Sequence, residues 1–511
     1  MKKIIISVIG IMILLVSGFL IWVGAIVDQN QLQPLLSKAL GSKYRVEMRS
    51  ANISLLNRAI YAGGITILSA PDDQPILETD TISLSGIGLG AIFGKNFSID
   101  ILQVNDFTLN WDYSLLQEDN DTSQSPSTQK LAIQAVDLKN GTVKIIKNRQ
   151  ESSRYNDVSL KAGFEYNFRN SAEDSSRQKS RIKVDTLGLL FSEDRYRLAV
   201  SGLNFRQEDG FVSLSSMKLK PVGGYDQFMA TLEYATNMFD IEVDDLKASG
   251  IDSKAFSKDK QINADLIEFG SFNIHVAKNK QIPEDPNKEK PQLLHKSIQQ
   301  LPYDIQLDSL TFKHTNIQYS EQDEDGARPG TISFMNSTIY INNVDSRSSS
   351  PSILRAATYL ENHSQLNTEL TFTLNDGPFH MTGTGDLKTF DLTQLNSIFT
   401  DLEGIEIKSG NLHELNFEFE MKDDTSSGKM YLIYENLTIK PVDKDEHEGS
   451  FMKSVRGFFV NDLALRSENM ADRNDEVKTG EIKYERDPDD SFFKYLWQTL
   501  RSGIFDIALR V

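Results

Sequence analysis

Alternation of apolar and polar residues with a period of two runs through most of the chain and limits what it can fold into. Two neighbouring stretches show it best, and both end or begin at the polar turn predicted from Asp423 to Gly428. The alternating apolar residues are Leu415, Phe417, Phe419 and Met421 in the first stretch and Met430, Leu432 and Tyr434 in the second. This period gives a strand one apolar and one polar face, so we expect antiparallel strands joined by polar turns.

The same alternation predicts strands elsewhere along the chain. The clearest lie at 44–48, 52–56, 64–68, 164–168, 181–185, 211–219, 239–243, 332–344 and 370–374. Four stretches also resemble one another, and we expect each to be strand, turn, strand: 99–111, 133–146, 262–276 and 305–319. Such self-similarity suggests a sheet extended by similar hairpins, although hairpins of any all-β protein look alike.

Residues 4–27 form an uninterrupted apolar stretch that follows Lys2 and Lys3. At about 1.5 Å rise per residue a helix of this length spans a hydrocarbon core of roughly 30 Å, so residues 1–27 are predicted to be a transmembrane anchor. The lysines favour a cytoplasmic N-terminus and an exported bulk. The alternative is a cleavable secretory signal, whose apolar region is usually shorter, about 7 to 15 residues.

The C-terminal segment, residues 487–511, changes period and is predicted to be an amphipathic helix. Its apolar residues recur at spacings of three and four, from Phe492 to Val511, and Gly503 is a point where it could bend. Two roles are open for this helix. It either caps the last strand and closes the sheet edge, or it touches a second membrane or a membrane protein.

Polar linkers divide the chain into segments. We expect a head at 28–116 that begins with a short amphipathic helix, a first β segment at 130–280, and a second β segment at 298–486. The linkers include 117–130 and 279–296, the latter with three prolines. The expected fold is mainly β, with the helices confined to the two ends.

Composition excludes several functions. A formal net charge of −18 without a basic cluster argues against binding nucleic acid. The absence of cysteine excludes thiolate chemistry, disulfides and a lipoprotein anchor. The seven histidines show no metal-ligand spacing, and no nucleophile or phosphate-loop motif is complete, so we expect a non-enzymatic protein without cofactor or metal.

Two regions resemble the AsmA-like family. The first comprises the anchor, DQNQLQPLLSKALGSKYRVEM, NISLLNRAIYAGGITIL and ILETDTISLSGIGLGAIFGKNFSIDILQVNDFTLNW. The second is GTGDLKTFDLTQLNSIFTDLEGIEIKSGNLHELNFEFEMKDDTSSGKMYLIYENLTIKP, which is also similar to the related DUF748 group. The resemblance covers much of the chain but rests on patterning, with no catalytic motif.

This resemblance implies a single-pass inner-membrane protein whose bulk lies in the periplasm of a Gram-negative bacterium. It implies a chorein-like head followed by an elongated, curled β-groove that supports phospholipid transport between the inner and outer membranes, with the C-terminal helix as a contact for the outer membrane or its proteins. The alternative is a scaffold for outer-membrane protein assembly, in which strand edges pair with client strands.

Alternation alone selects the side chains expected to line such a groove. They are Phe372, Leu374, Leu415, Phe417, Phe419, Leu432 and Tyr434. An apolar trough of this kind would shield acyl chains from water at about 0.8 kcal/mol per buried methylene. The competing interpretation is that the same residues form the interior of an ordinary two-sheet sandwich.

Overall fold

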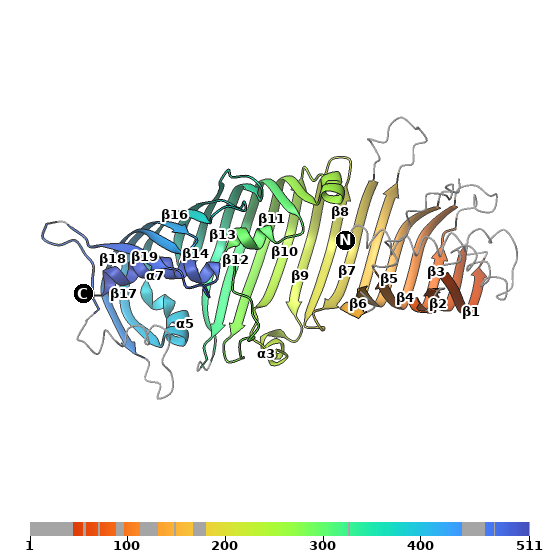
Figure 1. The fold of residues 1–511 in the computed structure, drawn as a ribbon, viewed down its shortest axis with the longest axis horizontal. Coiled ribbons are helices and arrows are strands. Elements are labelled where there is room, and N and C mark those ends of the chain that lie inside the picture. Colours follow the sequence, from red (N-terminus) through yellow and green to blue (C-terminus); the bar gives the residue numbers. More distant parts are fainter. Residues whose placement is uncertain are drawn as a thin grey trace. The chain divides into compact units, whose positions relative to one another are not determined.

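The computed structural model describes a mainly β protein with few helices (Figure 1). It describes residues 44–54, 58–69, 72–87, 97–112, 131–147, 150–166, 180–324, 328–441, 465–474 and 476–509. The predicted anchor at 1–27 and the helix expected after it lie outside these residues. No helix within the described ranges is long and apolar enough to cross a membrane. Nineteen strands are described, and the chain divides into two compact units between Val222 and Gly223, inside the predicted segment 130–280.

The first unit is an open sheet in which each strand pairs with the next along the chain. Its strands are β1 (Tyr44–Ser54), β2 (Ala59–Ser69), β3 (Pro75–Ser85), β4 (Phe97–Asp112), β5 (Leu131–Lys147), β6 (Gln150–Tyr166), β7 (Ser180–Phe191), β8 (Tyr196–Arg206) and β9 (Phe211–Pro221). All pairs are antiparallel except β4 with β5.

The second unit repeats this plan. Its strands are β10 (Met238–Ser249), β11 (Gln261–Asn279), β12 (Asp304–Gln322), β13 (Gly330–Asp345), β14 (Ser352–Leu360), β15 (Ser364–Phe372), β16 (His380–Asp391), β17 (Ile405–Lys422), β18 (Thr425–Pro441) and β19 (Thr479–Glu485). Again only one pair, β11 with β12, is parallel. The turn between β17 and β18 contains only Asp423 and Asp424, so it is shorter than the predicted turn to Gly428.

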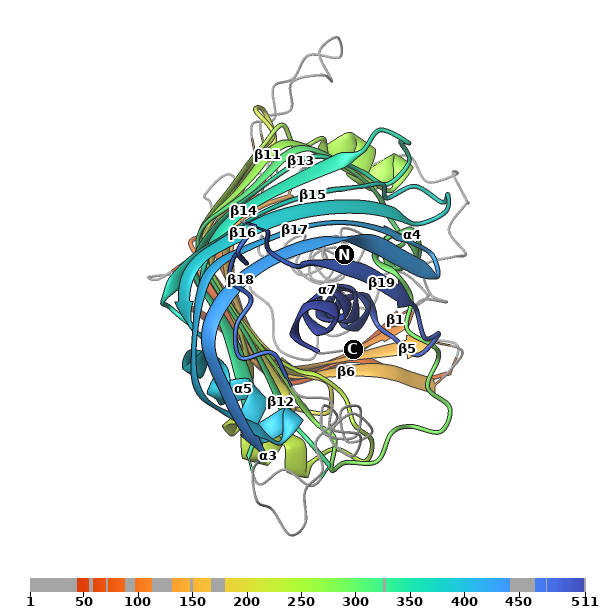
Figure 2. The same cartoon turned by 90° about the vertical axis from the view of Figure 1, so that its left-hand side faces the viewer.

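Helices are short, with one exception. They are α3 (Gly224–Ala230), η4 (Ala255–Asp259), α4 (Leu294–Gln299), η5 (Leu392–Leu395), α5 (Asn396–Ile398), η6 (Phe399–Glu403) and α7 (Phe492–Ala508). The predicted C-terminal helix is therefore present as α7. Its N-cap is Ser491, whose hydroxyl accepts a hydrogen bond from the Lys494 amide at 3.3 Å, and it runs unbroken through Gly503. Figure 2 shows the sheet of the second unit curling around α7.

The four mutually similar stretches are the four strands of the two parallel pairs. Each was expected to be a hairpin, and this expectation is wrong, because each forms one long strand: 99–111 lies in β4, 133–146 in β5, 262–276 in β11 and 305–319 in β12. Their similar residues lie side by side, with Ile99 opposite Ile133 and Phe269 opposite Phe312. A parallel neighbour requires a connection that returns along the strand, here residues 280–303 between β11 and β12.

Turn-like residues inside the strands interrupt the regular backbone instead of reversing the chain. Asp106 of β4, Asn140 of β5 and Asp157 of β6 have positive φ angles of 51°, 53° and 49°. Asn and Asp tolerate this left-handed conformation better than other residues with a side chain, and one such residue in a strand bends it. Two of these residues meet across neighbouring strands, since the Asn140 side-chain amide donates to the Asp106 carboxylate at 3.0 Å. A row of left-handed residues therefore crosses β4, β5 and β6.

The buried core of the first unit is formed by one face of β1–β6. Its most deeply buried members are Val46, Ile60, Ile67, Ile99, Leu102 and Val104. Trp111 belongs to this cluster and is 3% exposed. One-sided burial of this kind is what the alternating sequence predicts.

Candidate functional site

A continuous apolar surface lies on one face of β10–β13. Residues opposite one another on neighbouring strands share a face of the sheet. We name this surface the mid-sheet face, and it consists of Ile241, Val243, Leu246, Ile267, Phe269, Phe272, Ile274, Leu310, Phe312, Ile317, Ile339 and Ile341. The intervening residues on the other face are polar and include the ion pair between Lys313 and Glu268 at 2.8 Å.

Three phenylalanines form the centre of the mid-sheet face. Phe269 and Phe312 stack with ring centroids 4.6 Å apart, and Phe272 meets them edge-on at 5.7 and 5.3 Å. Residues three apart in a regular strand point to opposite faces. Here the alternation is interrupted, because Asp245 and Gly270 are left out of an otherwise constant register and Asp245 has φ of 52°. This interruption brings Phe269 and Phe272 onto the same face.

The mid-sheet face is only partly covered by the rest of the described protein. Val243 is 1% exposed, but every other member is partly exposed. Of the helices in the described ranges, those that pack extensively on β10–β13 are the short α3, η4, α5 and η6. Eleven partly exposed apolar side chains on one face form a contiguous apolar surface, and such surfaces usually mark interaction sites.

The seven side chains predicted to line a groove lie further along the same sheet, in one hydrophobic cluster. We call this cluster the covered face: Phe372, Leu374, Phe417, Phe419, Leu432 and Tyr434 are buried in it, and Leu415 packs against it. Phe417 and Phe419 stack at 6.0 Å. Ile341 belongs to the mid-sheet face and also packs against this cluster, so the two surfaces are continuous. Sequence alternation placed the seven on a common face, but most of them lie beneath other parts of the chain.

Helix α7 supplies much of the cover. Tyr495 and Ile507 are 0% exposed and belong to the same cluster as Met430 of β18 and Ile482 of β19. Burial raises the pKa of Tyr495 to about 12, and its hydroxyl donates to the Lys422 carbonyl oxygen at 3.1 Å. The Thr499 hydroxyl of α7 is also paired, with the Ser426 hydroxyl at 2.8 Å, as expected of hydroxyls in a permanent interface.

The same helix closes the outer edge of β19. The backbone amide of Glu481 donates to the Asp506 carboxylate at 2.9 Å, and that of Lys483 donates to the Ser502 hydroxyl at 3.1 Å. Lys478 also reaches the backbone oxygen of Asp506. Unpaired edge amides are a template for another strand, and here two of them are occupied by side chains of α7. Of the two roles predicted for this helix, the contacts are those of the cap.

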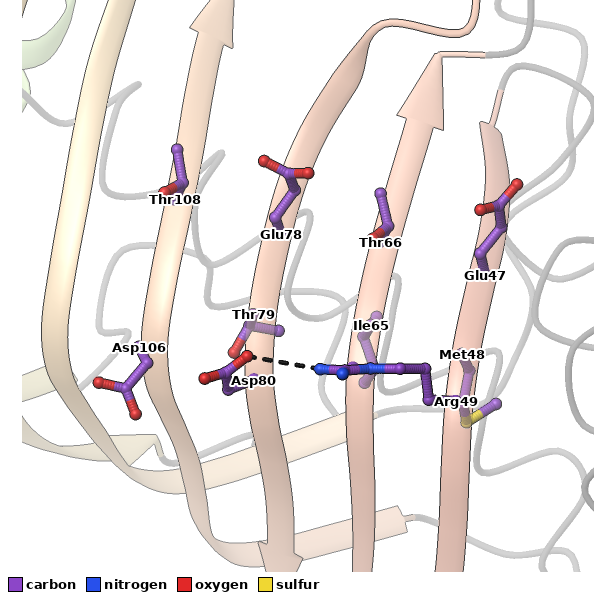
Figure 3. A pocket seen from close by; sticks show the side chains of 11 residues that line it. Glu47, Met48, Arg49, Ile65, Thr66, Glu78, Thr79, Asp80, Asp106 and Thr108 are labelled. Atoms are coloured by element: carbon purple, nitrogen blue, oxygen red, sulfur yellow. Dashed lines mark ion pairs between the residues drawn. The ribbon is translucent and has the colours of Figure 1, made fainter.

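A polar pocket lies on β1–β4 of the first unit (Figure 3). Its lining includes Glu47, Glu78, Thr108 and an ion pair between Arg49 and Asp80 at 3.5 Å. Both partners of this pair are largely exposed, so the attraction is weakened by water. No cluster of ligating side chains in the described ranges could hold a metal ion. We therefore assign no chemistry to this pocket.

One arrangement on the polar face superficially resembles a catalytic group. His275 Nε2 lies 2.8 Å from the Ser320 hydroxyl, and Asp240 lies opposite His275 on β10. The Ser320 side chain is 5% exposed, and its hydroxyl also bonds that of Thr331 at 2.8 Å. Burial is the main cause of a lowered pKa of His275, which Asp240 opposes. A hydroxyl held in this way is suited to cross-strand pairing.

The chain matches no family model and no curated protein sequence.

Sequence reasoning missed the mid-sheet face, although a signal for it existed. Phe269 and Phe312 occupy equivalent positions in two of the four similar stretches. In-register parallel pairing of those stretches would have placed the two rings side by side. The hairpin interpretation concealed this, because it put a chain reversal inside each stretch.

Proposed function

We propose that the mid-sheet face binds the acyl chains of phospholipids and that the protein is a non-enzymatic lipid-binding protein. The observation that supports this proposal is that the covered face and the mid-sheet face are continuous, although the protein buries only the first. Where α7 lies on the sheet, apolar side chains are buried by the protein itself. On β10–β13 the same face remains partly exposed, and hydrocarbon is the simplest ligand for a surface with no buried charge.

The free energy of acyl-chain transfer favours movement of a lipid along the mid-sheet face over tight binding. Moving an acyl chain from a bilayer into water costs about 0.8 kcal/mol per methylene. An apolar protein surface removes much of that penalty, but it offers no net gain over the bilayer. Because the mid-sheet face has rings and aliphatic branches and no anchoring cation, a bound chain would be held by area alone and would be able to slide.

The cellular setting is part of the same proposal. With the predicted anchor at 1–27 and the AsmA-like resemblance, we infer a protein attached to the inner membrane of a Gram-negative cell that supports phospholipid movement toward the outer membrane. The alternative role as an assembly scaffold requires available strand edges. The bonds from Glu481 and Lys483 to α7 argue against that role at the β19 edge.

Phe312→Asp is the direct test, with Tyr340→Asp as its matched control. Tyr340 lies between two members of the mid-sheet face, so it points to the opposite face, where it is 49% exposed. Mass spectrometry of lipids carried by the purified full-length protein should show a several-fold loss for Phe312→Asp and wild-type levels for Tyr340→Asp. A folded wild-type protein without phospholipid, or equal lipid in both variants, would reject acyl binding here.

A further inference from the structure

The connection between the parallel strands β11 and β12, residues 280–303, is held at several points along the second unit. Near its middle, Arg486 Nη2 donates to the Pro291 carbonyl oxygen at 3.1 Å. At α4, Lys296 pairs with Asp376 at 2.5 Å, and Gln299 Nε2 donates to the carbonyl oxygens of Ser346 and Leu374 at 2.5 and 2.7 Å. We call this segment the strap. It joins the β15–β16 loop to the segment that precedes α7.

The strap carries a buried histidine without a hydrogen-bond partner. His295 in α4 is 2% exposed, and neither of its ring nitrogens has a hydrogen-bond partner among the residues that the structure describes. Its ring stacks on Phe379 at 5.5 Å, and Phe379 in turn meets Phe492 of α7 at 6.1 Å. Leu293 beside it is also buried in the covered face. Burying a neutral imidazole in this apolar site costs free energy. Burying an imidazolium there costs far more, because its charge has no acceptor.

Among the described residues, the carboxylates that attract the protonated ring already bind other groups. Lys296 repels it, while Asp423 and Asp376 attract it. Both carboxylates are already engaged, since Asp376 pairs with Lys296 and Asp423 accepts from the Phe379 amide at 3.0 Å. Burial is the largest cause of a lowered pKa of His295 in the docked strap, followed by repulsion from Lys296. Lys494 of α7 is also engaged, because it pairs at 2.7 Å with Asp490, which precedes that helix.

We propose that His295 makes the strap an acid-sensitive latch, which is docked at neutral pH and is released from the covered face on acidification. A released strap has a solvated histidine with a pKa near its ordinary value of about 6.5. The docked strap excludes the proton, so docking is unaffected above that pH and weakens as the pH falls below it. Release uncovers Phe379 and its neighbours and thereby enlarges the apolar surface. The latch itself does not depend on the proposed lipid binding.

Hydrogen exchange of the full-length protein, followed by mass spectrometry, tests the latch. After correction for intrinsic exchange rates, protection of residues 291–300 should fall by up to about tenfold between about pH 7.5 and pH 5.5, as one excluded proton requires. His295→Phe should abolish this fall, because it keeps the ring stacking and removes the titration. His314→Phe, which removes an exposed histidine of β12, should retain it.

Two outcomes would overturn the proposal. One is a wild-type protection factor that does not change with pH. The other is an equal fall in wild type and His295→Phe. If the phenylalanine variant loses protection in β17 as well, His295→Met takes its place as a second apolar, non-titrating side chain. Because lipid enters none of these measurements, failure of the latch and failure of acyl binding are separate results.

Discussion

The covered face and the mid-sheet face belong to one apolar surface, but the protein buries the first and leaves the second partly exposed. On the covered face, Tyr495 and Ile507 of α7 complete a core in which Met421 is 0% exposed. On the mid-sheet face, the rings of Phe269, Phe272 and Phe312 pack mainly against one another and remain partly exposed. The strands are alike in pattern, so the difference comes from the segments that dock on them, chiefly α7 and the strap with α4.

This difference in burial means that the two faces should contribute differently to stability and to lipid binding. An apolar residue contributes most to stability where its surface is fully removed from water, about 25 cal/mol for each Å². Residues that remain partly exposed contribute less and are free to contact a ligand. We therefore expect substitutions on the covered face to act on folding and those on the mid-sheet face to act on lipid.

The same substitution at both places should give the largest difference. Phe417→Asp introduces a carboxylate at a 9%-exposed position in the covered face, which we expect to destabilise the second unit by about 3–5 kcal/mol. Phe312→Asp allows the carboxylate to reach water, so about 1–2 kcal/mol is expected. Urea unfolding measured by far-UV circular dichroism compares the two. Equal losses would mean that the mid-sheet face is as buried as the covered face.

The sequence predicted the class of fold and the faces of the strands well, because a period of two needs only local information. Leu415, Phe417 and Phe419 share a face as alternation requires. The C-terminal helix was likewise predicted from spacing, but its closure of the β19 edge depends on Ser502 and Asp506, which have no distinguishing local pattern.

Other features depended on long-range geometry. A left-handed residue such as Asn140 gives the same local signal in a bulge as in a hairpin turn, so the long strands were mistaken for hairpins. Which apolar face is covered could not be predicted either. That depends on where α7 and α4 dock, and their partners lie tens of residues away in sequence.

A substitution that disturbs the close packing of α7 on β19 should cause the next-largest loss of stability. A Cβ added at Gly480 would lie 2.5 Å from the backbone oxygen of Gly503, which cannot move without shifting the helix. We expect Gly480→Ala to destabilise the second unit by about 1–3 kcal/mol, as overpacking does. Gly188→Ala in β7 is the control, since a Cβ there meets nothing within 4 Å and should be neutral or mildly stabilising. Urea midpoints of the two variants decide the matter, and a neutral Gly480→Ala would show that α7 is loosely docked.

Loss of the two hydrogen bonds from the β19 edge to α7 should cause the smallest change in stability but a distinct change in association. Removing both acceptors, as Ser502→Ala with Asp506→Ala, leaves the Glu481 and Lys483 amides without them and should cost about 1–2 kcal/mol. Exposed edge amides recruit another strand, so sedimentation velocity should reveal concentration-dependent dimers. Asp489→Ala is the control, because its pair with Lys290 is 3.4 Å long and solvent-exposed. If the double variant stays monomeric, α7 protects the edge by covering it, and its two hydrogen bonds to the edge amides are dispensable.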